Sequence, residues 1–328
     1  MPRRPSSIVA PRPDVVGIAR DVSASPSAGA RLPRLAITLG DPRGIGPEII
    51  QAALADPDVR AAATFVVVGP SGSTMKADVV VGEWKAGDSA DRAGALAGKA
   101  IERAVQMAMH GECDGIVTAP IDKSALLAGG FDYPGHTEML AALTQSTTAM
   151  MLASDRLRVV LMTTHIPLRD VISAVTADSI TTAATVTRAG LRDWFGIATP
   201  RIALCALNPH AGDHGRFGSE DDDLLRPAAA TLGLFGPFPA DTVFVRAMRG
   251  EFDAVIAPYH DVGMTAIKVA SFGSAVNVTL GLPFPRTSPD HGTALDIAGK
   301  GLADASSMRQ AILVGAQIAS RLAAGRAG

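Results

Sequence analysis

Three histidines in this sequence each follow an apolar, strand-like run directly: His165, His210 and His260. Because the carboxyl ends of neighbouring parallel strands lie along one edge of a sheet, imidazoles this far apart in sequence can meet there. Three neutral imidazoles leave coordination positions of a metal ion open for water or substrate, as a catalytic site requires. A single histidine in such a place is usually a hydrogen-bonded structural residue, but the threefold recurrence predicts a divalent-metal site.

Charged side chains also gather in the segment 258–300, which otherwise consists of apolar runs and Gly/Pro turns. The charges lie at strand ends and in turns instead of at helical intervals, which favours a pocket over a solvated helix face. Arg286 is expected in Pro-bounded turns, and its guanidinium is suited to bidentate binding of phosphate or carboxylate. The alternative is a polar, turn-rich surface loop.

Two further positions have the setting of a ligand contact. His136 and Thr137 stand where a Gly-containing turn becomes a helix, so free backbone amides are available to an anion. A simple helix cap is the alternative there. Lys123 follows the carboxyl end of another predicted strand, the usual ligand edge of a parallel sheet, although an exposed lysine explains it equally well.

The bulk composition limits the kinds of function. Of 328 residues, 47% are hydrophobic and only 4% aromatic, which favours an α/β protein with helices on a parallel sheet. A formal net charge of −2 gives no broad attraction to nucleic acid or membrane, so small-molecule chemistry is expected. No apolar run is long enough for a membrane span, and Cys113 and Cys205 are expected to be reduced and buried, which predicts a cytoplasmic protein.

Strand and helix patterns alternate along the part of the chain that must position these residues. Strands are predicted over 35–40, 63–69, 79–81, 159–162, 202–207, 254–257 and 276–280. Helices are predicted to begin near Pro47, to end at Gly111 and to cover 307–324. Residues 1–33 are rich in Pro, Ser, Ala and Arg without a sustained period and are expected to form a flexible tail.

Six motifs follow one another in the chain: GDPRGIGPE, YPGHTE, TTHIPLRD, LNPHAGDHGRFGSED, YHD and NVTLGLPFPRTSPDHGTALDIAGKG. Together they resemble the 4-hydroxythreonine-4-phosphate dehydrogenase family of vitamin B6 biosynthesis. The resemblance implies two α/β/α domains of the isocitrate/isopropylmalate dehydrogenase-like fold, a cleft between them and a homodimer that shares the site. The implied domains are 34–134 with 297–328, and 135–296. Residues 70–91 are shorter than the corresponding family region, which departs from the pattern.

The resemblance also assigns chemistry to particular residues. His165, His210 and His260 match the ligands of a divalent metal, with His260 expected from the partner subunit. Five residues match substrate contacts: His136, Thr137, Lys268, Asn277 and Arg286. Asp241 matches an acidic residue of the same pocket.

A second set of residues matches the contacts to NAD: His291, Gly292, Thr293, Ala294 and Asp296. The carboxylate of Asp296 is expected to accept hydrogen bonds from the ribose hydroxyls and to exclude a 2′-phosphate, which favours NAD over NADP. Lys268, beside the metal, is expected to take or relay the proton of the reacting alcohol.

The implied reaction is NAD-dependent oxidation of the secondary alcohol of 4-(phosphooxy)-L-threonine, after which the β-keto acid loses CO2 to give 3-amino-2-oxopropyl phosphate. The substrate stays open between this amino acid and its analogues 4-phospho-D-threonate and 4-phospho-D-erythronate. A metal-dependent hydrolase is an alternative from another class, but it leaves HGTALDIAGKG without a role; a ligand sensor is a third. The metal is also open, because Zn, Co, Mn and Mg all suit such sites.

Overall fold

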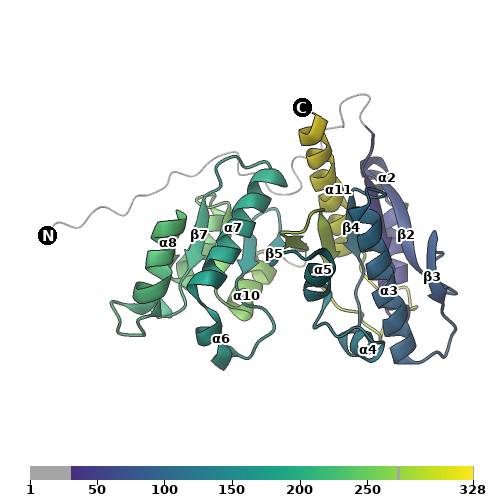
Figure 1. Ribbon diagram of the computed structural model, residues 1–328, viewed down its shortest axis with the longest axis horizontal. Coiled ribbons are helices and arrows are strands. Elements are labelled where there is room, and N and C mark those ends of the chain that lie inside the picture. The colour runs from purple at the N-terminus through teal and green to yellow at the C-terminus, as the bar shows by residue number, and fades with distance from the viewer. Residues whose placement is uncertain (1–30, 272–273, 328) are drawn as a thin grey trace.

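Short runs of apolar residues form the strands of one mixed sheet in the computed structural model, which describes residues 31–271 and 274–327, with side chains up to 325 (Figure 1). All but the last three residues of the predicted tail 1–33 lie outside the described residues. In spatial order the strands are β3 (Val79–Glu83), β2 (Thr64–Ser71), β1 (Arg34–Thr38), β4 (Gly115–Thr118), β11 (Arg286–Pro289), β10 (Val276–Leu280), β5 (Ala149–Ala153), β6 (Arg158–Leu161), β9 (Ala254–Ala257), β7 (Ile202–Cys205) and β8 (Phe235–Phe238).

The strand direction changes in the middle of this sheet. Strands β3, β2, β1, β4 and β11 run parallel to one another, and so do β6, β9, β7 and β8. Between the two sets, β10 is antiparallel to both β11 and β5, and β5 is antiparallel to β6. The two parallel sets therefore point in opposite directions, so the expectation of a parallel sheet holds only within each half.

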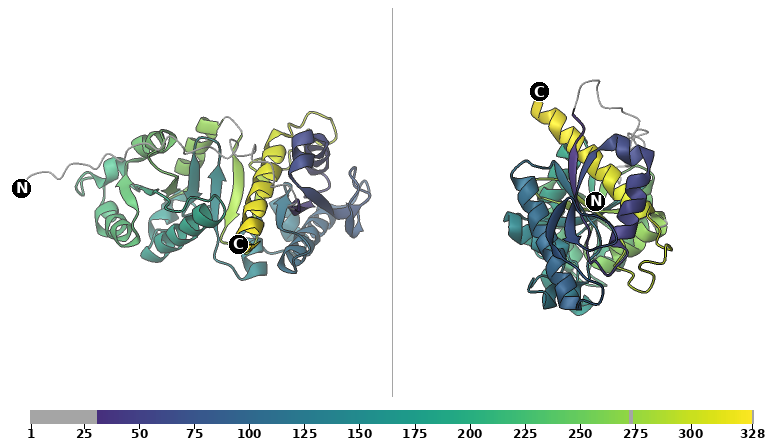
Figure 2. Two further views of the ribbon diagram at one scale, coloured as in Figure 1. Left: turned by 90° about the horizontal axis from the view of Figure 1, so that it is seen from above. Right: turned by 90° about the vertical axis from the view of Figure 1, so that its right-hand side faces the viewer.

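Helices cover both faces of the sheet (Figures 1 and 2). Their bounds are α1 (Gly46–Ala55), α2 (Pro57–Ala62), α3 (Ala90–Met109), α4 (Lys123–Ala128), α5 (His136–Thr144), α6 (Leu168–Ala174), α7 (Ala177–Asp193), α8 (Arg226–Leu232), α9 (Ala240–Met248), α10 (His260–Ser271) and α11 (Ser306–Ala327). A 3-10 helix, η1 (Pro209–Gly212), and a π-helical turn, η2 (Asp221–Leu225), precede α8. Across residues 31–271 and 274–327, every helix is too short or too polar to cross a membrane.

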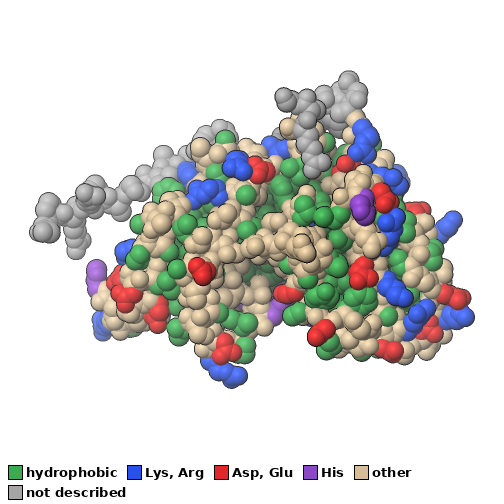
Figure 3. Space-filling model, viewed as in Figure 1, with side chains coloured by type: hydrophobic (Ala, Val, Ile, Leu, Met, Phe, Trp, Pro, Cys, Tyr) green, Lys and Arg blue, Asp and Glu red, His purple; other side chains and the backbone are tan. Residues whose placement is uncertain are grey.

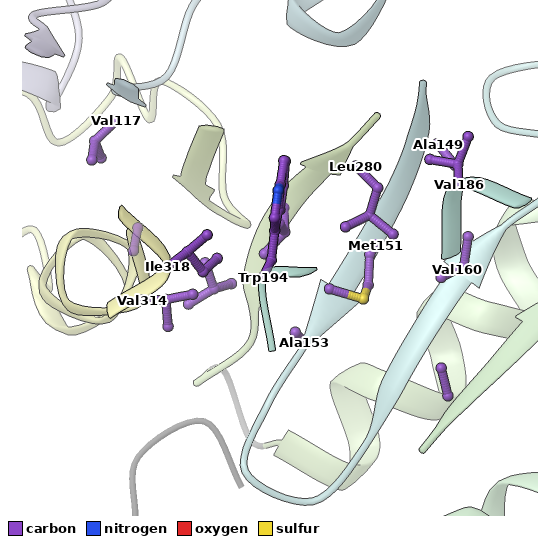
Figure 4. Packing of buried hydrophobic residues seen from close by; sticks show 14 of the residues in the cluster. Val117, Ala149, Met151, Ala153, Val160, Val186, Trp194, Leu280, Val314 and Ile318 are labelled. Carbon is purple, nitrogen blue, oxygen red and sulfur yellow. The ribbon is translucent and has the colours of Figure 1, made fainter. Parts of the chain in front are cut away.

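One buried apolar cluster connects the two halves of the molecule. Trp194 and Met151 belong to it together with Ile318 of α11 (Figure 4), and the same cluster includes Leu35 and Ile37 of β1. Helix α11 packs on β11, β4 and α1, and Figure 2 shows it near the middle of the elongated molecule. The C-terminal helix thus completes the core of the N-terminal half. The division into two domains stays a prediction, because the sheet is continuous through β11, β10 and β5.

Most predicted elements are confirmed, and one is wrong. The predicted strand at 79–81 is the edge strand β3, and Pro47 lies in the first turn of α1 as expected. Arg286, predicted in a turn, instead begins β11. The segment RTSP has a proline at its end and no apolar alternation, so its strand conformation depends on the two neighbours with which it pairs, β4 and β10.

Candidate active site

A cavity of about 550 Å³ lies over the central strands, where the strand direction changes. Its floor is one face of the sheet. Asn277 of β10 pairs with Leu152 of β5 on one side and with Ser288 of β11 on the other, so these three side chains project together into the cavity. Arg286, two residues before Ser288, lies on the same face. The register of three short strands therefore builds the floor.

The walls of the cavity come from both halves. The segment after β4, from Ala119 to Lys123, and the first turn of α5 supply one side. Helix α10 and His165 supply the other, and residues 290–292 close the third. Because the carboxyl ends of β4 and β6 lie at opposite edges of the mixed sheet, the cavity sits on a sheet face between two edges and not at one shared edge.

Two of the three predicted metal ligands lie together in one chain. The ring centroids of His165 and His260 are 5.5 Å apart and the ring planes differ by 44°. Two imidazoles bound tetrahedrally to one zinc ion at N–metal distances near 2.1 Å would have centroids roughly 5 Å apart, so the pair fits a shared ion. His260 Nδ1 lies 2.6 Å from Asp261 Oδ1, a contact that favours one orientation of the ring and leaves Nε2 available to a ligand.

The third predicted ligand lies elsewhere. His210 is exposed on η1 with a left-handed φ of 56°, its ring packs near Phe217, and it does not line the cavity. Within residues 31–271 and 274–327, no group of three or more His, Cys, Asp or Glu side chains is arranged to hold a metal ion. Within one chain, His260 therefore lies beside His165 and His210 stands apart. The contribution of a second subunit to this site stays a prediction.

The pKa of His165 is lowered from 6.5. Desolvation is the first cause, the positive charge of Lys123 is the second, and the charge of Glu138 opposes them. The imidazole therefore stays neutral to a lower pH than a histidine with the ordinary pKa of 6.5. A neutral ring is the form that binds a metal.

Arg286 provides the strongest positive charge in the floor of the cavity. Its side chain is only 1% exposed, and its guanidinium donates to the hydroxyl oxygens of Thr118 and Thr279. Among the described residues no carboxylate forms an ion pair with it, and the acidic group with the largest electrostatic effect on it is Glu138. Burial lowers the pKa of Arg286 to about 9, which leaves it a cation at neutral pH. Such a group is suited to binding phosphate or carboxylate.

The first turn of α5 provides further donors. No described side chain caps this helix at Gly135, so the backbone amides that begin at His136 and Thr137 are available to an anion. The Nε2 atom of His136 is buried without a hydrogen-bond partner. Burial, and then the charges of Arg286 and Lys123, lower the pKa of His136 well below 6.5, so the ring is neutral. The predicted helix start at His136 is confirmed.

Two other predicted substrate contacts also line the cavity. Lys268 of α10 faces it with an exposed side chain. Asn277 donates from Nδ2 to the Met150 sulfur at 3.5 Å, while its Oδ1 is buried without a partner. A buried amide oxygen of this kind can accept a hydrogen bond from a hydroxyl or ammonium group of a ligand.

The predicted cofactor residues divide into two groups. His291 and Gly292 line the cavity, whereas Thr293, Ala294 and Asp296 lie beyond it, with Asp296 exposed.

The loop after β1 contacts this segment directly. The Ile45 amide donates to the Thr293 carbonyl at 3.0 Å. A Cβ added to Gly44 would lie 2.9 Å from the same carbonyl oxygen. Two segments far apart in sequence thus form one continuous surface beside the cavity.

A charged network holds the loop after β1 in place. Arg43 donates to both oxygens of the buried Asp41 at 3.0 and 2.7 Å and also to Asp122 at 3.1 Å. Gly40, with φ of +72°, allows the chain to pass close to the Pro120 carbonyl. The loops after β1 and β4 are therefore fixed to each other at the cavity wall.

One residue assigned from the resemblance lies outside this cavity, and its role stays a prediction; other residues that line the cavity were missed. Asp241, predicted in the same pocket, is exposed in the first turn of α9 and does not line the cavity. Side chains that line the cavity but were not predicted include Thr118, Glu138, Met150, Leu152, Met264, Thr265, Ser288 and Asp290. Most of them lie on strands or helices, where alternation alone does not reveal which face carries a ligand.

Comparisons with known proteins agree with this geometry. One family model, described as "Pyridoxal phosphate biosynthetic protein PdxA", matches residues 46–315. The 4-hydroxythreonine-4-phosphate dehydrogenase of Geobacter metallireducens is 42% identical over 325 residues, covering 88% of this chain and 96% of that protein. The D-threonate 4-phosphate dehydrogenase of Cupriavidus necator is 41% identical, covering 89% of this chain and 99% of that protein.

Solved structures extend the likeness to the fold. A crystal structure of 4-hydroxythreonine-4-phosphate dehydrogenase from Klebsiella pneumoniae matches with a TM-score of 0.78 and 38% identity, covering 89% of this chain and all of that one. Isocitrate dehydrogenase from Methylococcus capsulatus matches with a TM-score of 0.50 and 16% identity, covering 88% of each chain. The predicted isocitrate/isopropylmalate dehydrogenase-like α/β fold is confirmed.

Proposed function

This chain belongs to the family of the pyridoxal phosphate biosynthetic protein PdxA, and on that premise we propose that this oxidoreductase oxidises 4-(phosphooxy)-L-threonine with NAD. The substrate's C3 hydroxyl loses a proton and C3 loses a hydride, which gives 2-amino-3-oxo-4-(phosphooxy)butanoate and NADH. That β-keto acid then loses CO2 to give 3-amino-2-oxopropyl phosphate. The identity and coverage of the relatives named for this reaction support the proposal.

The observation that carries the proposal is the combination of a histidine pair with a buried, uncompensated arginine in one cavity. The pair of His165 and His260 suits a divalent metal, and Arg286 suits an anionic group. A metal-dependent hydrolase would also use the histidines, but it needs no surface formed by the loop after β1 and residues 290–293. A phosphorylated hydroxy acid and a nucleotide together would use the histidine pair, Arg286 and this surface.

A bound divalent metal would supply a Lewis acid at the substrate hydroxyl, and bound NAD would accept the hydride. Arg286 and the uncapped first turn of α5 bind the phosphate, which orients the carbon chain across the floor of the cavity. Lys268 lies on the opposite wall and takes or relays the proton of the hydroxyl. The unpaired Asn277 Oδ1 accepts from a polar group of the same substrate.

We also propose that the site is completed in a homodimer. His210 is exposed on η1, outside the cavity of its own chain, so it is free to reach the His165–His260 pair of a second copy. Exposed apolar side chains follow His165 directly, namely Ile166, Leu168 and Ile172. An apolar surface beside an incomplete metal site supports contact between two copies there.

A second substrate has specific support. The relative from Cupriavidus necator, almost as similar as the one from Geobacter metallireducens, is named D-threonate 4-phosphate dehydrogenase. The D-threonate ester has a hydroxyl where the amino acid has an ammonium group. Glu138 of the cavity wall forms no hydrogen bond or ion pair among the described contacts and is suited to accept from the ammonium, which favours the amino acid.

We propose that the enzyme works in the cytoplasm. Cys113 and Cys205 are both free and buried, and burial raises the pKa of the Cys205 thiol to about 12. Thiols of this kind are typical of proteins in reducing compartments. Charged side chains of both signs are mixed over the face shown in Figure 3, in agreement with a small-molecule substrate instead of nucleic acid.

The deciding experiment measures NADH formation with 4-(phosphooxy)-L-threonine, 4-phospho-D-threonate and 4-phospho-D-erythronate, with and without a chelator. The expected result is NADH formation that is fastest with the amino acid, is abolished by chelation and is restored by added metal. Faster oxidation of a threonate or erythronate ester would select the second substrate. Hydrolysis of a phosphate ester without NADH formation would refute the dehydrogenase assignment.

A further inference from the structure

Among the residues that the structure describes, only neutral groups hold the Arg286 guanidinium. Its Nε and Nη2 donate to Thr118 Oγ1 at 3.2 and 2.6 Å, and its Nη1 donates to Thr279 Oγ1 at 2.9 Å. All three side chains are buried, with exposed fractions of 1% for Arg286 and 0% for both threonines. Burial of a charge without an opposite charge costs free energy, so this arrangement needs an explanation.

Several other arginines of the same chain are paired with carboxylates. Arg43 donates to Asp41 and Asp122, and Arg309 also contacts two aspartates. In those pairs the carboxylates neutralise the arginine and the contact is structural. A hydroxyl oxygen satisfies the hydrogen-bond donors without cancelling the charge. The positive potential of Arg286 is therefore left for whatever enters the cavity.

The sheet register fixes both hydroxyls. The antiparallel register of β10 and β11 puts Thr279 directly opposite Arg286. The parallel register of β11 and β4 pairs Arg286 with Ile116, so Thr118 lies two residues further along the same face. A guanidinium has five N–H donors and three are used here, which leaves two for a ligand. The strands that pair with β11 on either side, β4 and β10, therefore determine the plane of the Arg286 guanidinium.

We infer that Thr118 and Thr279 are positioning residues, which fix the plane of the Arg286 guanidinium in the cavity floor and leave its charge for the phosphate or carboxylate of the substrate. The inference rests on the proposed function, because it assigns the anion to a phosphorylated hydroxy acid. If the inference is correct, the substrate binds because no carboxylate beside Arg286 neutralises its charge. A planar fork with a fixed orientation loses little conformational entropy when it binds an oxyanion.

Replacing either hydroxyl by a methyl group tests the inference. Thr118→Val and Thr279→Val should each weaken binding of inorganic phosphate and raise KM for 4-(phosphooxy)-L-threonine roughly tenfold, with little change in kcat or NAD affinity. Thr118→Ser and Thr279→Ser retain the oxygen and should restore both values. Thr118→Asp supplies a carboxylate to Arg286 and should reduce phosphate binding further. Calorimetry measures phosphate binding, and initial rates give KM and kcat.

Thr287→Val is the matched control. Thr287 is a buried neighbour on β11 whose hydroxyl donates to the Ala311 carbonyl, away from the cavity. The Thr287→Val variant loses a buried hydrogen bond, as the test variants do, but it should bind phosphate as tightly as the wild type. If a valine variant does not fold, Thr118→Cys gives the same comparison, because its thiol is a weaker acceptor.

The outcomes separate this inference from the proposed function. Unchanged phosphate affinity and KM in both valine variants would overturn the inference. An equal loss of phosphate affinity in Thr287→Val would overturn it too, as would a wild-type chain that binds no phosphate. A different result would separate the two ideas: the wild-type chain oxidises no phosphorylated hydroxy acid, but the Thr118→Val variant binds phosphate more weakly than the wild type. In that case the proposed function fails and the positioning role stands.

Discussion

The imidazole rings of His165 and His260 lie 5.5 Å apart in one chain, although they follow two different strands. Strands β6 and β9 are parallel neighbours, so the segments that leave their carboxyl ends begin side by side. Asp261 contacts His260 and thereby favours one orientation of its ring. Two of the three predicted metal ligands therefore lie together within one chain.

This arrangement predicts how the metal is held. His165→Gln and His260→Gln should each weaken zinc binding by more than the roughly 10–100-fold that is typical for loss of an outer-shell partner. Calorimetric titration of the chelator-treated protein measures the affinity. His214, exposed in the same loop as His210, is the control, and His214→Gln should bind zinc as the wild type does. Equal affinities in all three variants would remove the metal site.

Lys268 is predicted to act on the proton of the substrate hydroxyl. Lys268→Met should lower kcat by about 100-fold or more, because general acid–base catalysis typically contributes this much. NAD affinity, followed by fluorescence titration, should be unchanged. Lys99→Met changes an exposed lysine of α3 outside the cavity and serves as the control. A Lys268→Met enzyme with normal kcat contradicts the assigned role.

His136 is predicted to make stability depend on pH. Burial lowers its pKa well below 6.5 in the folded chain, so on acidification the unfolded chain takes up a proton first. Stability is therefore lost as the pH falls below 6.5, by up to about 1.4 kcal/mol per pH unit. Urea unfolding between about pH 7.5 and 5.5 measures this slope. His136→Gln should have a smaller slope than the wild type, and identical slopes would exclude the effect.

Gly40 is predicted to be required by the close approach of two loops. A Cβ at this position would lie 2.3 Å from the Pro120 carbonyl oxygen. The left-handed φ of +72° would strain any residue with a side chain as well. Gly111 has nearly the same φ, +73°, but open space around it. Gly111→Ala should therefore cost roughly 1 kcal/mol of unfolding free energy, and Gly40→Ala should cost clearly more. Chemical denaturation compares the two, and equal losses would argue against a tight contact.

The sequence predicted the elements with strong apolar patterns but not their directions. Strand β10 has an evident apolar run, yet nothing in Val276–Leu280 indicates that it is antiparallel to both of its neighbours. Arg286 was expected in a turn because prolines bound its segment, but pairing with β4 and β10 makes RTSP a strand. Strand direction and such tertiary pairing depend on contacts far apart in sequence.

In the candidate site, too, the sequence predicted some residues and missed others. His136, Lys268 and Asn277, predicted from the resemblance, all line the cavity. Asp241 and His210 do not, because a motif identifies a residue type and not the subunit or surface that receives it. Thr118 was missed, since a threonine in a buried strand gives no sign of the arginine that it contacts.

The order in which the sheet is assembled along the chain has a consequence for synthesis. Strand β4 gains its neighbour β11, and β1 and β4 gain the covering helix α11, only from residues after 285. The N-terminal half therefore remains incomplete until residues 286–327 have left the ribosome. Until then its exposed strand edge and apolar face are open to chaperones or to other nascent chains.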